Sequence, residues 1–238
     1  MTAGDRATGE RATGERATGD GGLSVDGLAS TLALRLTGAG HAWLTNAVSA
    51  VGGSADTIDQ LFPAVRRHCG HGPLLASTGP ATGPATGPGL HGWTVDEAAR
   101  VLLLTALPIS GDALAGTVAR LYERGDAAER RAVLRALPLL DVGPDTVAIV
   151  RDALRTNDAT LVAAALGPYA ARHLDDASWR QGVLKCVFLG VRLSEVADLT
   201  RRADEELVRM LVAFAHERIA AGRDVPPDVL AVVESFQP

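Results

Sequence analysis

The constant spacing of proline after three apolar segments constrains the fold more than any other feature of the chain. Pro108, Pro138 and Pro168 are 30 residues apart, and they end the segments AARVLLLTALP, RAVLRALP and LVAAALGP. Proline has no backbone N–H and cannot continue a helix, so each segment is predicted to be a helix that stops at an equivalent point. A helical hairpin that recurs about every 30 residues is typical of a stacked α-solenoid.

Capping residues at the start of these segments agree with the helix prediction. Thr94 with Glu97, and Asp126 with Glu129, have the three-residue spacing of a capping box. In a capping box, the N-cap side chain and the later glutamate bond reciprocally to free backbone N–H groups. Asp158 opens the third segment in the same manner.

A second helix is predicted after each proline. The triplet Thr-Val-Ala recurs at 117–119 and 146–148, an offset of 29 residues, and residues 179–189 form the second helix of the third unit. We therefore predict an all-α fold of stacked helical hairpins, HEAT-like, with repeats of about 30 residues. Because the identity between units is weak, an irregular α-helical bundle is the alternative.

The composition excludes several classes of protein. Aromatic residues make up 4% of the chain, so the core is expected to consist of Ala, Leu and Val rather than the alternating residues of a β-sandwich. The formal charge is −5 and the arginine pairs are isolated, which argues against nucleic-acid binding. No segment approaches the ~20 apolar residues of a membrane span, and the N-terminus lacks a signal-peptide pattern. We expect a cytoplasmic protein without direct membrane insertion, and the Ala, Gly and Arg content indicates an actinobacterial genome.

Two low-complexity segments divide the chain. Residues 1–22 contain a five-residue repeat with little to bury, so they are predicted to be a disordered tail. Residues 77–92 are rich in Gly, Pro and Thr and are predicted to be a linker or surface loop. This division leaves an N-terminal helical segment at 23–76 and a helical-repeat domain at 93–238.

The search for catalytic and metal-binding motifs is mostly negative. His68, Cys69 and His71 form the only tight cluster of metal-ligand types. Three ligands so close together cannot close a tetrahedral site without a distant fourth, so no metal is expected, and no cofactor motif is found.

Gln181 and Lys185 form the polar pair of greatest interest. They are four residues apart and therefore share a helix face, within an otherwise apolar run. Lys185 either extends its ammonium group to solvent along an apolar surface or pairs with a carboxylate in a groove. As a nucleophile it would need a pKa lowered by burial. His216 would act as a general base only with a partner and a substrate pocket.

A longer series of residues resembles a known family. It consists of Pro168-Tyr169, Arg172-His173-Leu174-Asp175, Trp179, Gln181-x-Val183-Leu184-Lys185-x-x-Phe188, Leu199, Arg202-Ala203, Glu206-Leu207, Arg209-Met210-Leu211, Ala215-His216-Glu217-Arg218, Ala221-Gly222-Arg223 and Pro227. In order and spacing it resembles the EboA family of metabolite traffic proteins, from about residue 93 onward. Gly167 and Arg180 differ from the asparagines of the family pattern.

The resemblance implies a non-catalytic accessory protein, encoded with a biosynthetic gene cluster, that helps to move a secondary-metabolite precursor towards the periplasm or out of the cell. Its partners would be that precursor or cluster-encoded proteins. We expect a groove lined by the second helices, with candidate contacts at Tyr169, Arg172, Gln181, Lys185, His216 and Arg218. The alternatives are a helical-repeat scaffold for proteins without a small ligand, and a small enzyme centred on Lys185 or His216. Exposure and wide separation of those two side chains would argue against an enzyme.

Overall fold

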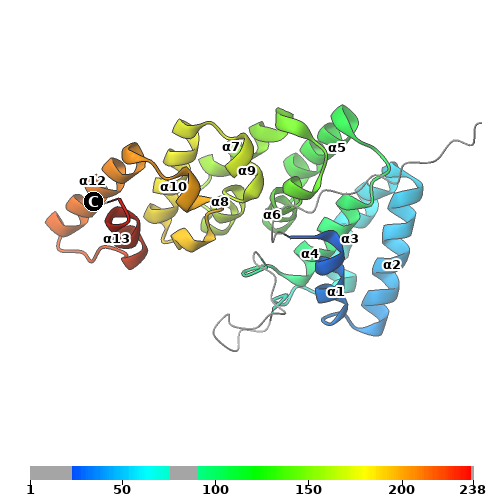
Figure 1. Cartoon of the computed structure of the whole chain (residues 1–238). Coiled ribbons are helices and arrows are strands. Elements are labelled where there is room, and N and C mark those ends of the chain that lie inside the picture. Colours follow the sequence, from blue (N-terminus) through cyan, green and yellow to red (C-terminus); the bar gives the residue numbers. More distant parts are fainter. Residues whose placement is uncertain (1–22, 76–89, 237–238) are drawn as a thin grey trace, which may run out of the picture.

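The computed structural model describes residues 23–75 and 90–236, and this part of the chain is helical (Figure 1). It contains thirteen α-helices and four short 3-10 helices, and its only β-type pairing is an isolated bridge between Pro73 and Thr94. The all-α prediction is confirmed. The predicted disordered tail lies outside the described residues, as does most of the predicted linker.

Within residues 23–75 and 90–236 the elements are all helices. The α-helices are α1 (Val25–Ala33), α2 (Gly38–Gly53), α3 (Ile58–Cys69), α4 (Val95–Thr105), α5 (Gly111–Arg124), α6 (Ala127–Ala136), α7 (Val147–Arg155), α8 (Ala159–Ala165), α9 (Pro168–His173), α10 (Asp176–Leu189), α11 (Leu199–Arg202), α12 (Glu205–Ala220) and α13 (Pro227–Glu234). The 3-10 helices are η1 (Ala55–Thr57), η2 (Leu137–Leu139), η3 (Gly143–Thr146) and η4 (Leu193–Glu195). No helix in the described ranges combines the length and apolarity that a membrane crossing requires.

The helices begin where the capping residues predict. The Thr94 N–H donates to the Glu97 carboxylate at 3.1 Å at the start of α4. At the start of α6, Asp126 and Glu129 bond reciprocally at 2.9 and 3.0 Å. Asp158 accepts hydrogen bonds from the first backbone N–H groups of α8. These local bonds satisfy donors that the first turn of a helix leaves free.

The three prolines do not act identically. α4 ends at Thr105, ahead of Pro108, whereas Pro138 lies inside η2, directly after α6. Pro168 is the first residue of α9, a short helix that separates α8 from α10. Proline is favoured at this first position because its missing N–H would have no partner there. The third unit therefore contains one more helix than the two-helix pattern predicts.

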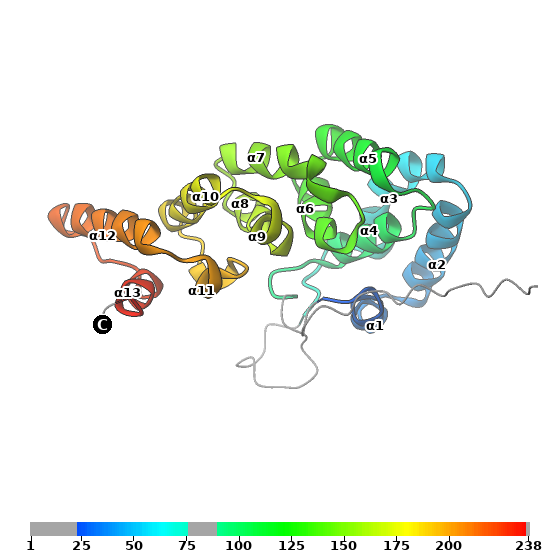
Figure 2. The ribbon, with the colours of Figure 1, turned by 45° about the horizontal axis from the view of Figure 1, so that its top comes forward.

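The helices form an elongated row (Figures 1 and 2). α4 packs against α6, α6 against α8, α8 against α10, and α10 against α12. α5 lies against α6, and α7 lies against α8. At the ends of the row, α1, α2 and α3 pack on α4, and α13 packs on α12. A HEAT-like repeat in this row stays a prediction.

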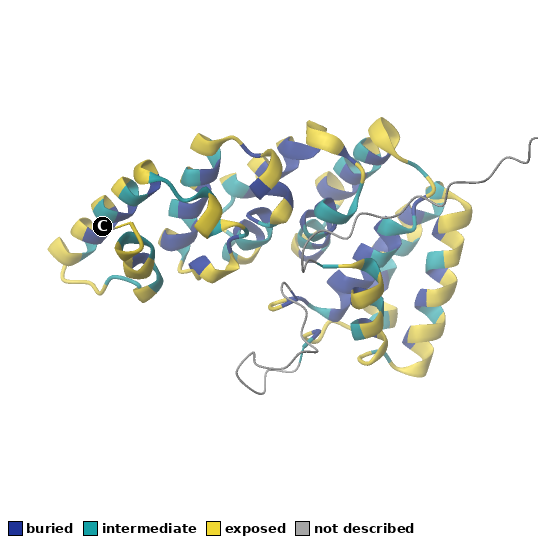
Figure 3. Ribbon diagram, viewed as in Figure 1, coloured by how far each residue is buried: buried dark blue, intermediate teal, exposed yellow. Residues whose placement is uncertain are grey.

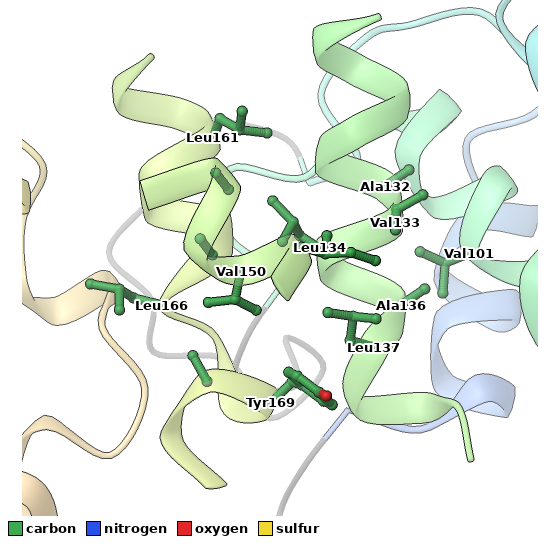
Figure 4. Close-up of a cluster of buried hydrophobic side chains, with 14 of the residues drawn as sticks. Val101, Ala132, Val133, Leu134, Ala136, Leu137, Val150, Leu161, Leu166 and Tyr169 are labelled. Carbon is green, nitrogen blue, oxygen red and sulfur yellow. The ribbon is translucent and has the colours of Figure 1, made fainter. Parts of the chain in front are cut away.

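One cluster of buried apolar side chains extends along the row from Leu28 in α1 to Val229 in α13 (Figure 3). In its middle, side chains such as Leu134 of α6, Val150 of α7 and Leu161 of α8 fill the space between neighbouring helices (Figure 4). The segments on either side of residues 76–89 are joined as well, because the Leu74 N–H donates to the Trp93 carbonyl at 2.8 Å.

Arg100, in α4, is a buried arginine whose bonds join three helices. Its Nη1 lies 2.8 Å from the Asp96 carboxylate, its Nε donates to the Phe62 carbonyl at 3.1 Å, and its Nη2 lies 3.5 Å from Glu129. Only 1% of the Arg100 side chain is exposed. A buried charge is tolerated when it is paired and hydrogen-bonded in this way, so Arg100 fixes α4 relative to α3 and α6.

Glu97 is also a buried charge of α4, like Asp96 and Arg100. The Nε of Arg131 donates to its Oε1 at 2.6 Å, and Arg135 contacts its Oε2. Arg135 also lies over the Trp93 ring, 4.9 Å from the centroid. Both arginines belong to α6, so this cluster holds α4 and α6 in a fixed relation.

Candidate functional site

Two open grooves lie along the row, one on either side of α7. The α5/α7 groove, with a volume of about 650 Å³, lies between α5 and α7. The α7/α10 groove, with a volume of about 540 Å³, lies between α7 and α10. Arg155, the last residue of α7, lines both grooves. Further depressions lie near the C-terminal end of the row, one of them lined by Val187, Val191 and Pro227.

Small side chains and an ordered polar pair form the α5/α7 groove. Ala115, Ala119 and Ala148 line it. The Tyr122 hydroxyl donates to the Asp152 carboxylate across the groove at 3.1 Å. Burial, together with this hydrogen bond, raises the pKa of Tyr122, so its hydroxyl remains a donor at neutral pH.

A guanidinium group closes one side of the same groove. Arg130 lies over the Tyr122 ring, 5.2 Å from its centroid, and donates to the Gly125 and Glu123 carbonyls at 3.0 and 3.1 Å. The donors of Arg130 are thus partly used within the protein. With the carboxylates of Glu123, Asp145 and Asp152 also in its lining, the α5/α7 groove has mixed charge.

The α7/α10 groove is lined by basic and apolar side chains. Arg155 comes from α7, while Gln181 and Lys185 come from α10. Next to them, Leu184 and Phe188 supply an apolar wall, and 62% of Phe188 is exposed. No aspartate or glutamate belongs to this lining.

A glycine and a capping aspartate set the position of α10 in this groove. A Cβ atom at Gly182 would lie 3.0 Å from Leu166 and 3.3 Å from Leu154, so glycine permits the close approach of α10 to α7 and α8. Asp175 caps α10 through the Ser178 N–H at 2.8 Å. Its other oxygen accepts from Arg151 of α7 at 2.9 Å, and this ion pair joins the two walls at one end.

Of the six predicted contacts, the structure brings only Gln181 and Lys185 together in one groove. Tyr169 is instead a core residue, 3% exposed. Its hydroxyl accepts from Thr146 at 2.7 Å and donates to the Gly143 carbonyl at 2.6 Å, and burial raises its pKa. Tyr169 therefore joins α9 to η3.

The remaining three candidates lie apart from the grooves. Arg172 is exposed and reaches the Pro138 carbonyl at 3.4 Å. His216 is exposed on α12. Arg218 donates to the Asp224 carbonyl at 2.5 Å and so holds the segment C-terminal to α12. Lys185 is half-buried in the α7/α10 groove. His216 is not among the residues that line this groove.

The histidine and cysteine cluster at the end of α3 has a packing role. His68 stacks on Trp43 with 4.5 Å between the ring centroids, and burial raises the pKa of the Cys69 thiol to about 11. Within residues 23–75 and 90–236, no three His, Cys, Asp or Glu side chains are grouped as metal ligands.

Sequence reasoning missed the residues that α7 contributes. Arg151 and Arg155 are four residues apart, the same spacing as Gln181 and Lys185, so a shared helix face was visible in the sequence. What the sequence did not show is that this face of α7 lies opposite α10. Tyr122 and Asp152 were missed for the same reason, because their pairing depends on how α5 and α7 pack.

Comparison with known protein families identifies a match over most of the chain. The family model described as "Metabolite traffic protein EboA" matches residues 25–234, a range that begins with α1 and ends with α13. The resemblance found from about residue 93 onward thus extends to the N-terminal helices. No curated protein and no solved structure matches the chain.

Proposed function

Because this chain belongs to the EboA family of metabolite traffic proteins, we propose that it is a non-catalytic protein that binds a secondary-metabolite precursor. In this proposal it is an accessory protein of a biosynthetic gene cluster and takes part in trafficking or export of the precursor. It works from the cytoplasm, in an actinobacterial cell, together with cluster-encoded proteins.

The observation that carries the proposal is the pair of grooves on either side of α7. Their volumes, about 650 and 540 Å³, lie in the range of small-molecule sites, roughly 300–1,000 Å³. Both combine apolar side chains with a few polar groups, which is the usual composition of a ligand site. Gln181, Lys185 and Arg155 are the contacts we assign to the precursor.

We also propose that the row of helices is a HEAT-like solenoid of hairpins. The order of packing, α4 on α6 and α6 on α8, with α5 on α6 and α7 on α8, supports it. In such an array every unit contributes an equivalent helix to one surface, and grooves form between those helices. The α5/α7 and α7/α10 grooves would then be successive members of one binding surface.

A clean deletion tests this function. We expect the precursor to accumulate in the cytoplasm and to decrease in the exported fraction, measured by untargeted mass spectrometry of both fractions. A copy of the wild-type gene should restore the distribution. A copy with Arg155→Glu and Lys185→Glu should not, whereas the matched control Arg124→Glu, on the exposed end of α5, should restore it. An unchanged distribution in the deletion strain would refute the proposal.

The exposed apolar side chains near the end of the row favour a second candidate, a protein scaffold without a small ligand. Phe188, Ile219 and Leu230 are 62%, 64% and 43% exposed. They come from α10, α12 and α13, which pack on one another in that order, and exposed apolar patches often mark contacts between proteins. Affinity purification with mass spectrometry separates the two candidates: a cluster-encoded protein retained without any co-purifying metabolite would support the scaffold.

A further inference from the structure

The α7/α10 groove carries positive charge that the protein itself does not neutralise. Its lining contains Arg151, Arg155 and Lys185 and no acidic residue, although the chain has a net charge of −5. Arg151 is paired with Asp175 at 2.9 Å. Among the described residues, no ion pair includes Arg155 or Lys185. Two cations on opposite walls are thus available to a ligand.

An isolated lysine at an apolar surface is commonly explained by its long stem, which covers apolar neighbours while the ammonium group reaches water. That explanation accounts for Lys185, which is half-buried between apolar neighbours on α10. It does not account for Arg155, which comes from another helix and lines the same groove. Cations that converge from two elements are the arrangement that binds carboxylate, sulfonate or phosphate groups.

The groove also offers a surface for an apolar body next to the cations. Leu154 and Leu184 line it, and Phe188 is held edge-on against Phe214, with 5.1 Å between the ring centroids. A large aromatic side chain that is 62% exposed but fixed by a neighbouring ring can stack with a ligand at a small entropic cost. The α5/α7 groove differs, because its lining contains the carboxylates of Glu123, Asp145 and Asp152.

We propose that the α7/α10 groove binds an amphipathic small anion: a carboxylate, sulfonate or phosphate attached to a flat apolar group. Arg155 and Lys185 bind the anionic group, and Gln181 donates a hydrogen bond to it. The apolar group lies on Leu184 and Phe188. This inference rests on the proposed function and specifies the chemical class of the metabolite. Because the cations are partly exposed, affinity falls as ionic strength rises.

A matched pair of fluorescent probes tests the inference on the full chain. 1-Anilinonaphthalene-8-sulfonate carries the anion, and N-phenyl-1-naphthylamine has the same aromatic skeleton without it. We expect the sulfonate to bind about tenfold more tightly. Lys185→Gln and Arg155→Gln should each weaken it by about fivefold, the scale of a partly exposed ion pair, and should leave the neutral probe within about twofold. Arg124→Gln, the matched control, should change neither, and circular dichroism verifies the fold of each variant.

Lys185 also allows direct observation, because it is the only lysine in the chain. Reductive methylation with ¹³C-formaldehyde labels its Nζ and the N-terminal amine alone. The sulfonate should shift the dimethyl-Lys185 signal in the ¹³C–¹H spectrum, and the neutral probe should not.

Three results would overturn the inference. Equal affinity for both probes would show an apolar site without anion recognition, and sulfonate binding that neither variant weakens would place the probe elsewhere. Retention of the protein on phosphatidylglycerol vesicles, lost in the same variants, would assign the cations to a membrane surface. None of these results would refute the proposed function itself, whose failure appears as an unchanged metabolite distribution in the deletion strain.

Discussion

Replacement of Glu97 by glutamine tests whether the buried charges of α4 hold α4 and α6 together. The Glu97 side chain is 1% exposed, and its carboxylate meets Arg131 at 2.6 Å, Arg135 and the Thr94 N–H at 3.1 Å. Glutamine has nearly the same shape but no charge, and it places an amide NH₂ group where one oxygen faced an arginine. Removal of one partner of a buried ion pair costs about 3–5 kcal/mol. Because glutamine keeps one acceptor oxygen, we expect a loss of about 3 kcal/mol.

Urea denaturation followed by circular dichroism at 222 nm measures this loss. With a slope of roughly 2–3 kcal/mol per molar urea, the midpoint should fall by about 1–1.5 M while the slope stays constant. Asp59→Asn is the matched control, since it removes one carboxylate charge from the pair with Arg120, whose side chains are 46% and 33% exposed. We expect that variant to lose less than about 1 kcal/mol. A midpoint shift for Glu97→Gln no larger than that of Asp59→Asn would refute the reasoning.

Three further predictions concern single groups. Asp175→Ala should lose about 1 kcal/mol at pH 7, because Asp175 caps α10. Hydrogen bonds from Ser178 lower the pKa of Asp175 in the folded state below its value in the unfolded chain. The stability that the Asp175 carboxylate contributes is therefore complete above about pH 4 and is lost as the pH falls through the folded pKa. The urea midpoints of the variant and the wild type should converge in acid for this reason. Tyr169→Phe leaves the Thr146 hydroxyl without its hydrogen-bond partner in the core. The free energy of unfolding should fall by about 1–3 kcal/mol in the same urea assay. An unchanged urea midpoint would contradict this hydrogen bond. Burial raises the pKa of Cys186 to about 12, so at pH 8 this thiol should react with 5,5′-dithiobis(2-nitrobenzoate) only after unfolding in urea. The test uses the Cys69→Ser variant, because Cys69 is a second free thiol, and rapid reaction of that native variant would contradict the burial of Cys186.

Local patterns in the sequence predicted the elements of this fold well. The capping pairs at Thr94 and Asp126 begin α4 and α6 as expected, because each depends on bonds between residues three positions apart. The sequence has few aromatic residues and lacks alternating runs of aromatic and β-branched residues, and this predicted the absence of strands from the described residues. The proline spacing correctly predicted that a helix ends before each proline. It did not predict the extra helix α9, since proline is also a good first residue of a helix, as Pro168 is there.

The candidate site shows where sequence reasoning reached its limit. The spacing of Gln181 and Lys185 fixed their common face, and the structure places both in the α7/α10 groove. Tyr169, in the same family pattern, points into the core and bonds to Thr146, because a tyrosine can serve packing or binding with the same local sequence. The family resemblance identified a pattern of residues and spacings in the chain but did not separate these two roles.

The sequence by itself determined the all-α class of the described residues, the starts of α4, α6 and α8, and the family to which the chain belongs, since these depend on contacts within a few residues and on residue order. Only the tertiary structure decided that α7 lies beside α10, that Arg155 and Lys185 line one groove, and that Gly182 permits the close approach of its walls. Such relations depend on how neighbouring helices pack. That packing is set by side chains from segments far apart in the chain, and no local spacing encodes it.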